Sequence, residues 1–233
     1  MSMGKRGTLR FTDAKRPITT AITKFGGQPV WISGPQWPMS RSTGLPMRFI
    51  GQVVIPEHVL AGDTPKIAYI FMTDGDEYVD GTWEPNGGEN AVVIQPETGC
   101  EAPIVDVKPL GNGPTIQRYE KRLFSKKLKP VDVELEVDVD WKEEPDFVSG
   151  GDRAKFSDQE NEAYWNAVQG TKIGGAPAFI QYDEYPDTDK KWLLLLQIDS
   201  CDIPFFLNLG DSGIAYVYVD EGAKRGRMLW QCS

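Results

Sequence analysis

The sequence predicts a mainly β protein, an α+β chain with minor helix, whose antiparallel sheets are built from an internally duplicated unit. Three observations predict this class: apolar runs of strand length, one alternating segment and a set of repeated blocks. The apolar runs occupy residues 66–72, 91–95, 193–199 and 214–219, and turn-forming Pro, Gly, Asp or Asn residues separate them. Runs of this length are typical of strands joined by turns.

The alternating segment is the clearest single strand. From Val131 to Trp141, apolar residues occupy every odd position and acids occupy every even position. A period of two places the apolar side chains on one face and the carboxylates on the other, about 7 Å apart. Carboxylates at this spacing repel each other, so a cationic neighbour is expected. The sequence leaves two sources open: the basic stretch 118–129 of the same chain, or an external partner.

Helix is predicted with complete end signals at one place. Residues 157–160 form a capping box, the apolar pattern continues through Val168, and Gly170 ends the segment. A short helical turn is expected after Pro56, over residues 57–60.

Self-similarity defines the organisation of the chain. The segment KFGGQPVWI at 24–32 recurs 148 positions later as KIGGAPAFI at 172–180. FIGQV at 49–53 then matches LLLQI at 194–198, and AYIFM at 68–72 matches AYVYV at 215–219. Three blocks in one order predict a duplication. We therefore predict a single domain over 1–233, with two repeats at about 24–72 and 172–219 joined by a charged β insert at 73–171.

Each repeat carries the same structural motif of two glycines, a proline and a later glutamine. The glycines predict a turn with unusual backbone angles, and the residue before the proline predicts extended chain leading into a strand. The glutamine lies in an apolar strand, so its amide needs partners; we favour backbone groups of the Gly-Gly loop over a ligand. The motif residues are Gly26, Gly27, Pro29 and Gln52 in the first copy and Gly174, Gly175, Pro177 and Gln197 in the second.

These blocks, with Gly210-Asp211-Ser212-Gly213 before an aromatic-rich strand, resemble the YwqG-like family, a domain of unknown function. The resemblance covers most of the chain and not the acidic insert. Family members occur in bacteria beside toxin genes, which implies an immunity role for some of them. The Lys-x-Gly-Gly-x-Pro and Leu-Leu-Leu-Gln pieces are also similar to the C-terminal region of programmed cell death protein 2, whose group acts as dedicated chaperones of a ribosomal protein. The family has no established catalytic residues, so the resemblance implies none here.

Composition limits the classes of function. The chain carries 25 cations and 34 acids, a net charge of −9, and phosphate binding needs clustered cations, so we predict no nucleic-acid partner. No apolar run approaches the roughly 20 residues of a spanning helix, so we predict no membrane partner. Cys100, Cys201 and Cys232 lack a Cys-x-x-Cys pair, and no signal-peptide core is found. We therefore predict a reduced, cytoplasmic protein with no metal and no cofactor.

Two short motifs invite a more specific assignment. Gly210–Gly213 contains Ser212, but His58 lies in a predicted surface turn, so we interpret 210–213 as a turn in which Gly213 supplies a positive φ. Residues 74–81 are acidic but miss the ligand spacing of a calcium-binding loop, so we interpret them as a solvated loop.

We predict a non-catalytic protein-binding protein, most simply an immunity-type inhibitor that binds a basic toxin, such as a nuclease, through acidic surface. Trp83, in a polar loop, is either an exposed anchor or a buried plug. The alternatives are a dedicated chaperone of a basic protein, or an unrecognised enzyme or small-ligand binder with a cleft between the repeats. The predicted partner-binding residues are Asp76, Glu77, Asp80, Trp83 and Glu84, with Glu134, Glu136 and Asp138 as a second group.

Overall fold

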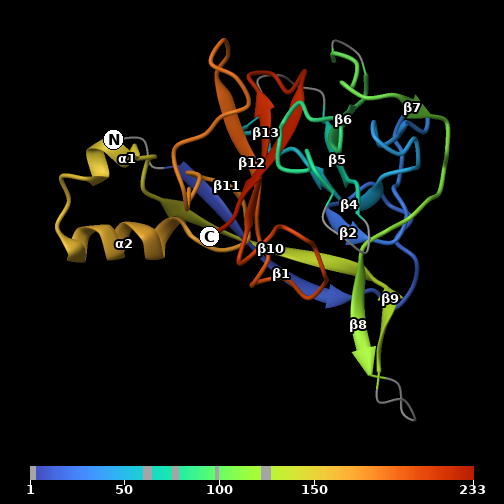
Figure 1. Ribbon diagram of the computed structural model, residues 1–233, viewed down its shortest axis with the longest axis horizontal. Helices are drawn as coiled ribbons and strands as arrows, with labels where there is room; N and C mark the ends of the chain where they lie inside the picture. The colour runs from blue at the N-terminus through green and yellow to red at the C-terminus, as the bar shows by residue number, and fades with distance from the viewer. Residues whose placement is uncertain (1–3, 60–64, 75–78, 98–99, 122–126) are drawn as a thin grey trace.

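The computed structural model describes residues 4–59, 65–74, 79–97, 100–121 and 127–233. Its main element is a ten-stranded antiparallel sheet in the order β14-β13-β12-β11-β1-β10-β2-β4-β5-β6 (Figure 1). The predicted class, mainly β with antiparallel sheets and minor helix, is confirmed. The strands of this sheet are β1 (Gly4–Asp13), β2 (Lys24–Gly26), β4 (Arg48–Val54), β5 (Ile67–Met72), β6 (Asn90–Gln95), β10 (Glu134–Glu144), β11 (Lys172–Gly174), β12 (Trp192–Asp199), β13 (Ile214–Asp220) and β14 (Gly226–Gln231).

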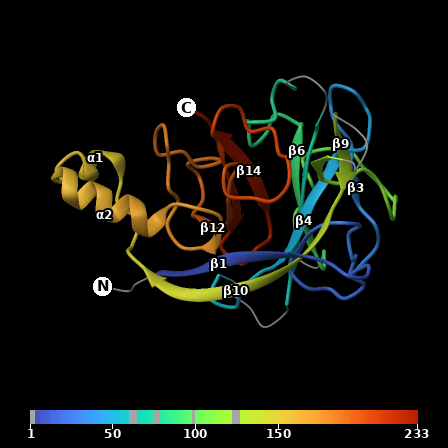
Figure 2. The same ribbon diagram turned by 90° about the horizontal axis from the view of Figure 1, so that it is seen from below.

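A long ribbon of two strands lies at the centre of the sheet. β1 and β10 pair from Gly4–Glu144 at one end to Asp13–Leu135 at the other, and Figure 2 shows them side by side. Four strands follow on each side, and the sheet curls until its two edges meet. At that seam a Cβ on Gly226 of β14 would lie 2.4 Å from Cγ1 of Val92 in β6, so the two edge strands lie in close contact. The sheet therefore nearly closes on itself.

The sequence missed β1, and this changes the interpretation of the acidic strand. β10 pairs with β1 along nearly its whole length, and Arg10 of β1 lies opposite Asp138. Within the described residues, the basic stretch 118–129 does not lie alongside β10, and only Arg118 lies opposite the alternating segment, at Val131. The first of our two explanations therefore does not hold for the acids of β10. Part of the basic stretch instead forms a separate two-stranded sheet of β8 (Gln117–Lys121) and β9 (Leu128–Asp132). The alternating segment is also two strands, because Val133 leaves the β8–β9 sheet and its amide donates to the Ile116 carbonyl.

The repeated blocks occupy equivalent places in the sheet. The three blocks of the first copy coincide with strands β2, β4 and β5, and those of the second copy coincide with β11, β12 and β13. The four motif glycines have positive φ values of 66°, 61°, 70° and 77°, as the Gly-Gly turn requires. The residues after each motif proline do not form the predicted strand. They cross the outer face of the sheet as irregular chain, because side chains from the sheet bind their backbone in place of a neighbouring strand. We call residues 27–36 and 175–191 the first and second crossing loops.

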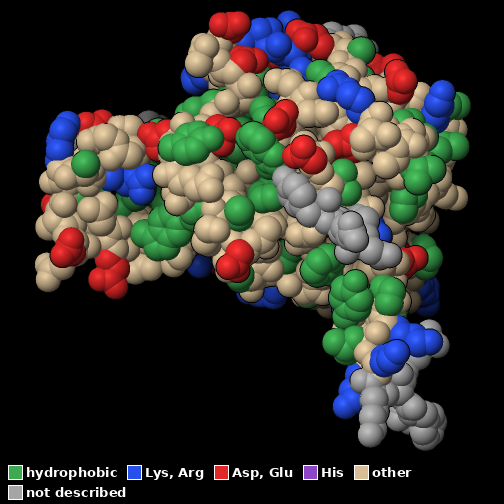
Figure 3. All heavy atoms as spheres, in the orientation of Figure 1, with side chains coloured by type: hydrophobic (Ala, Val, Ile, Leu, Met, Phe, Trp, Pro, Cys, Tyr) green, Lys and Arg blue, Asp and Glu red, His purple; other side chains and the backbone are tan. Residues whose placement is uncertain are grey.

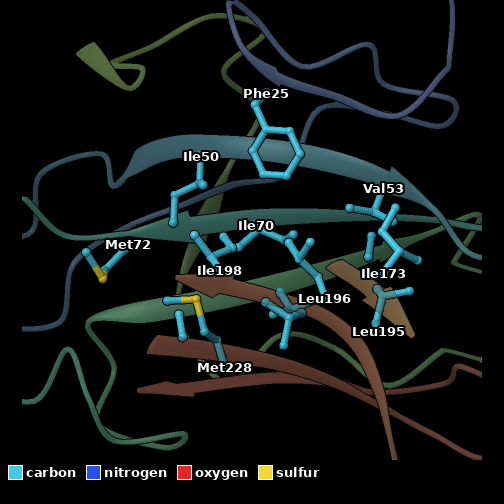
Figure 4. Packing of buried hydrophobic residues seen from close by; sticks show 14 of the residues in the cluster. Phe25, Ile50, Val53, Ile70, Met72, Ile173, Leu195, Leu196, Ile198 and Met228 are labelled. Atoms are coloured by element: carbon cyan, nitrogen blue, oxygen red, sulfur yellow. The ribbon is translucent and has the colours of Figure 1, made fainter. Parts of the chain in front are cut away.

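One apolar core fills the inside of the curled sheet. Figure 4 shows Phe25, Ile50 and Ile70 from the first set of strands facing side chains of the second set across this interior. The labelled partners from the second set are Ile173, Leu195, Leu196, Ile198 and Met228. All of these side chains are almost completely buried. Two smaller aromatic clusters lie on the outer face, under the crossing loops of each copy.

The helices lie at one end of the sheet. The predicted capping box at Ser157 and Glu160 is present and begins α2 (Asp158–Val168), which follows the short α1 (Gly150–Arg153). Tyr164 and Val168 of α2 pack on Ala176 and Ala178 of the second crossing loop. Residues 57–59 form a turn and not a helix; Leu60 lies outside the described residues. No helix within the described part of the chain has both the length and the apolar character needed to cross a membrane.

The turn at 210–213 corrects one backbone prediction. The positive φ values belong to Gly210 and Ser212, at 72° and 48°, and not to Gly213. Gly213 is required for a different reason, since a Cβ there would lie 1.9 Å from the carbonyl oxygen of Leu209.

Candidate functional site

The loop between β5 and β6 contains the first group of predicted partner-binding residues. Within it, Thr82 is buried and its hydroxyl donates to the Val79 carbonyl at 3.0 Å. The buried Asn90 amide donates to the carbonyls of Thr82 and Glu84 at 3.0 and 2.9 Å. These bonds fix the backbone on both sides of Trp83. We call residues 79–84 the acidic loop.

Two arginines from distant parts of the chain hold the next turn. Arg41 donates to the carbonyls of Asn86 and Gly87 at 3.3 and 3.1 Å. Arg227 of β14 donates from Nε to the Asn86 side chain at 3.1 Å. The turn after the acidic loop is therefore attached both to the segment that precedes β4 and to the opposite edge of the sheet.

A buried carboxylate supports the base of the same loop. Glu89 is 3% exposed and accepts hydrogen bonds from Ser40, Thr73 and the Ser42 amide at 2.6–2.7 Å. Burial alone would raise the pKa of Glu89, but these hydrogen bonds hold that pKa below its ordinary value. The charge therefore has partners and ties the loop to the segment around Ser40.

Trp83 lies at the exposed end of this supported loop. Its side chain is 37% exposed, and its carbonyl accepts a hydrogen bond from the Trp230 amide at 3.4 Å. Asp80 and Glu84 are exposed on either side of it in the chain. Trp83 is therefore not a buried plug. Asp76 and Glu77 lie outside the described residues.

The second predicted group lies elsewhere. Glu134 accepts a hydrogen bond from the buried Lys24 and another from the Ile18 amide at 3.1 Å, so its carboxylate is engaged within the protein. Glu136 and Asp138 are exposed on β10. Three strands separate β10 from β6 in the sheet, so the structure does not join these acids to the acidic loop.

The motif glutamines bind backbone. Gln52 accepts from the Val30 amide and donates to the Ile22 carbonyl, both at 2.8 Å. Gln197 accepts from the Ala178 amide at 2.9 Å and donates to the Gly170 carbonyl at 2.8 Å. Both side chains are fully buried and face crossing loops, so neither is positioned to meet a ligand.

Sequence reasoning missed further members of this repeated network. Tyr69 and Tyr216 donate to the carbonyls of Val30 and Ala178 at 2.7 and 2.6 Å. Gln95 and Gln231 accept from amides of the same crossing loops at 3.1–3.2 Å. Tyr69 and Tyr216 occupy the same place in the repeated blocks, so the sequence could have indicated that they share a role. Gln95 and Gln231 lie in segments with little other similarity, so no such indication existed for them.

The lysine that opens each of the two repeated blocks also has a structural explanation. Lys172 is fully buried and binds Glu144 at 2.8 Å and the Ala176 carbonyl at 2.6 Å. Burial lowers the pKa of Lys172 to about 8, although Glu144 acts to raise it. Lys24 makes the corresponding pair with Glu134 at the other end of β10. Glu134 was predicted on the charged face of a strand, whereas Glu144 lies outside that segment; both bind the lysine that opens a repeat.

A groove lies where the second crossing loop meets β1 and the turn after β4. It has a volume of about 270 Å³, and its lining includes Phe147, Trp192 and Tyr218. Lys5, His58 and Asp146 also line it. His58 packs edge-on against Trp141 at 5.1 Å, and partial burial together with Lys5 lowers the pKa of His58. Only the second Gly-Gly loop reaches this groove, whereas the predicted cleft used both loops and both glutamines.

Among the described residues, no three His, Cys, Asp or Glu side chains come together as a metal-binding group. Part of the acidic segment 74–81 lies outside those residues.

A family model described as a domain of unknown function, DUF1963, matches residues 23–225. The chain belongs to the DUF1963 family. The match begins at the first repeated block and ends within the turn before β14, so the family covers both repeats and the insert between them. No curated protein matches this member of the family.

Proposed function

We propose that this DUF1963 protein binds a basic protein and thereby inhibits it, with the acidic loop as the docking site. The observation that carries the proposal is the presentation of Trp83. Its side chain is 37% exposed on a loop whose backbone is fixed by Asn90 and whose neighbouring turn is held by Arg41 and Arg227. A preorganised aromatic side chain loses little conformational entropy on binding, which is why such residues act as interface anchors.

Charge supports a basic partner. The chain has a net charge of −9, and exposed Asp80 and Glu84 stand next to the anchor. Acidic groups around an apolar anchor steer a cationic partner toward the site and raise the association rate, an effect that salt screens. Inhibition by covering a partner's active site requires no chemistry from the loop.

The resemblance to the YwqG-like family refines this proposal. Because some members lie beside toxin genes, we propose that the basic partner is a toxin and that this chain is its immunity protein. A nuclease is the favoured class, since its substrate cleft is cationic and complementary to an acidic loop. The protein then acts in the compartment where the toxin would act, which we propose is the bacterial cytoplasm.

Affinity capture followed by a direct binding measurement tests the proposal. The wild-type protein, Trp83→Ala and the pair D80K/E84K are used to capture partners from the native cells, and the captured protein is then purified. We expect one basic protein, with an affinity about 30-fold weaker for Trp83→Ala because an aromatic anchor is lost. For D80K/E84K we expect slower association and a smaller effect of salt on it.

Matched controls separate a specific site from general acidity. Trp141→Ala removes another half-exposed tryptophan, 43% exposed on β10, and Glu221→Lys reverses an exposed acid in another turn. Both should bind as the wild type does. Equal affinity for all variants would rule out the acidic loop as the site. A client that binds only when unfolded would favour the chaperone alternative.

The groove supports a second candidate function, the binding of a small aromatic carboxylate. Its lining combines aromatic side chains with the cationic Lys5, and this combination suits such a ligand. Titration of a set of aromatic carboxylates, followed by NMR at His58, tests this function. Perturbation of His58 that is lost in Lys5→Ala would support it, and the absence of perturbation would exclude it.

A further inference from the structure

In each half of the main sheet, one short strand spans only part of the space between its neighbours. β2 lies between β4 and β10, and β11 lies between β12 and β1. Each of these two strands has three residues, whereas their neighbours have at least seven. We call the space beyond the end of β2 the first slot and that beyond the end of β11 the second slot. Because the two repeats are similar, the slots can be compared residue by residue.

The chain itself fills the first slot. The Phe49 amide donates to the Pro114 carbonyl at 2.9 Å, and the Ile116 amide donates to the Phe49 carbonyl at 3.1 Å. Residues 114–116 therefore run parallel to β4. On the other side of the slot, the Val133 amide donates to the Ile116 carbonyl at 3.2 Å. A short extended segment thus joins β4 to the residue that precedes β10.

The second slot has the same two walls. Leu194 matches Phe49, because each lies opposite an aromatic residue of the next strand and directly before a bulge. Lys5 matches Val133: a Cβ on Gly174 would lie 2.8 Å from the Lys5 carbonyl oxygen, and a Cβ on the matching glycine would lie 2.1 Å from that of Val133. Within the described part of the chain, however, no loop segment forms a backbone hydrogen bond with Leu194 or Lys5.

Aromatic side chains beside the two slots differ in exposure. Trp37 packs on Phe71 of β5 with ring centroids 5.2 Å apart, and Tyr185 packs on the matching Tyr218 of β13 at 5.5 Å. Trp37 is fully buried, and Gly113 lies so close that a Cβ there would be 2.7 Å from its ring. Tyr185 is 37% exposed. The second slot is therefore open where the first is covered.

The second slot coincides with the groove beside the second crossing loop, and its lining indicates what would fill it. Leu194 and Lys5 both line the groove, and Figure 3 shows apolar side chains at the surface between the helices and the main sheet. A Cβ on Gly174 would lie 3.5 Å from His58 Nε2, whereas in the first repeat the matching Cβ would lie 3.1 Å from Ile116 Cγ1. His58 thus takes the place of an apolar side chain. A residue bound here would meet an imidazole and the Lys5 ammonium, which suits an acidic side chain.

We propose that the second slot binds an extended peptide segment of another protein, which pairs in parallel with β12 at Leu194 and accepts a hydrogen bond from the Lys5 amide. Addition of an extended peptide to unpaired backbone of a sheet is a common mode of recognition. The peptide lays its backbone over Tyr185 and, three positions later, places an acidic residue beside Lys5 and His58. The proposal is independent of the acidic loop. It rests on the second candidate function, ligand binding in the groove, and names a peptide as the ligand in place of a small molecule.

NMR titration with synthetic peptides tests the proposal. The probe is acetyl-GNGPTD-amide, the sequence of residues 111–115 followed by aspartate. The amides of Lys5 and Leu194 and the imidazole of His58 should shift on saturable binding, whereas the Phe49 amide, whose slot is filled, should not. Acetyl-GNGPTI-amide, the chain's own sequence, should bind about tenfold more weakly because it lacks the carboxylate.

Methylation of single peptide nitrogens distinguishes strand pairing from other modes of binding and leaves the protein unchanged. In the first slot the Ile116 amide bonds to β4, whereas the Thr115 amide forms no backbone hydrogen bond within the described residues. N-methylation of the probe's aspartate should therefore weaken binding by about tenfold or more, and N-methylation of its threonine should have little effect. Equal effects of the two, or no shift of Leu194 with either peptide, would overturn the proposal.

Protein variants provide matched controls, with circular dichroism as the check of folding. Tyr185→Ser should weaken binding of the probe by about tenfold, because an aromatic contact is lost. Tyr182→Ser changes another exposed tyrosine of the same loop that does not line the groove, and it should bind as the wild type does. Lys5→Glu should abolish the preference for the aspartate peptide over the isoleucine peptide. An unchanged preference in Lys5→Glu, or equal losses in the two tyrosine variants, would contradict the proposal.

The two ligand classes proposed for the groove fail separately. Binding of the probe with the expected methylation pattern, together with no response to aromatic carboxylates, would support the peptide and exclude the small molecule. Perturbation of His58 by aromatic carboxylates and by neither peptide would overturn the peptide proposal alone.

Discussion

At the scale of single residues, Lys24 and Lys172 occupy the same position in the two repeats but have different surroundings. Lys172 and Glu144 are both fully buried, with Arg6 at 3.6 Å from the same carboxylate. Lys24 is equally buried, but its partner Glu134 keeps 19% of its side chain exposed. A fully buried carboxylate that loses the nearer of its two cationic partners cannot replace it with water, whereas a partly exposed carboxylate can.

Replacing each lysine by methionine should therefore have unequal effects. We expect Lys172→Met to lower the free energy of unfolding by about 3–5 kcal/mol. Lys24→Met should cost less, about 1–2 kcal/mol, because water reaches Glu134. Urea unfolding measures both, with the exposed Lys155→Met as the control that stays near the wild type. Equal losses at the two lysines would show that the difference in burial has no energetic effect.

Buried tyrosines predict a loss of stability at alkaline pH. Burial raises the pKa of Tyr69 to about 12 and raises the pKa values of Tyr216 and Tyr218. The unfolded chain releases these protons near pH 10, so above that pH it binds fewer protons than the folded chain, and stability falls. The contribution is complete below pH 10 and is lost as pH rises through 12.

Tyr69→Phe isolates this effect from other titrating groups. The difference in unfolding free energy between the wild type and Tyr69→Phe should be constant below pH 10. It should then shrink by about 2–3 kcal/mol as pH rises toward 12. The difference in phenolate absorbance between the wild type and Tyr69→Phe should show that the Tyr69 proton leaves the folded protein near pH 12. A pH-independent difference would contradict the assigned burial effect.

At the scale of elements, the crossing loops depend on side chains of the sheet for their backbone hydrogen bonds. Gln197 binds the Ala178 amide of the second loop and the carbonyls of Val168 and Gly170 at the end of α2. Gln52 binds the Val30 amide of the first loop and the Ile22 carbonyl before β2. An apolar replacement leaves those buried groups without partners. We expect Gln197→Leu and Gln52→Leu each to cost about 2–4 kcal/mol, against little change for the exposed Gln159→Leu.

Hydrogen exchange locates this effect. In Gln197→Leu the Ala178 amide should exchange faster while the Val30 amide keeps its protection, and Gln52→Leu should show the reverse. Uniform loss of protection in both variants would mean that the glutamines stabilise the whole sheet and not their own loops.

The sequence predicted elements well where burial was complete. The strands β5, β12 and β13 were found because both faces are buried and their residues form continuous apolar runs. β1 was missed because its glycines and cations gave no periodic pattern. The strands expected after the motif prolines were wrong because those backbones bond to side chains, a solution that local pattern does not reveal.

At the scale of the whole molecule, the candidate site depended on contacts that no local pattern contains. Trp83 and its acidic neighbours could be chosen from the sequence, but Arg41 and Arg227 lie 45 and 141 positions from Asn86, which both of them bind. The curled sheet brings β14 to β6 and so completes the support of the loop. The acidic surface was expected to include β10. In the sheet, however, three strands separate β10 from β6, the strand that follows the acidic loop.

The most direct test of the proposed docking site is photo-crosslinking in living cells. A photoreactive phenylalanine analogue replaces Trp83, and in a matched control it replaces Trp141. We predict a covalent adduct of position 83 with one basic protein, reduced when D80K/E84K is added to the same chain, and no such adduct from position 141. Adducts of the same protein from position 141 and none from position 83 would contradict the assignment of the acidic loop.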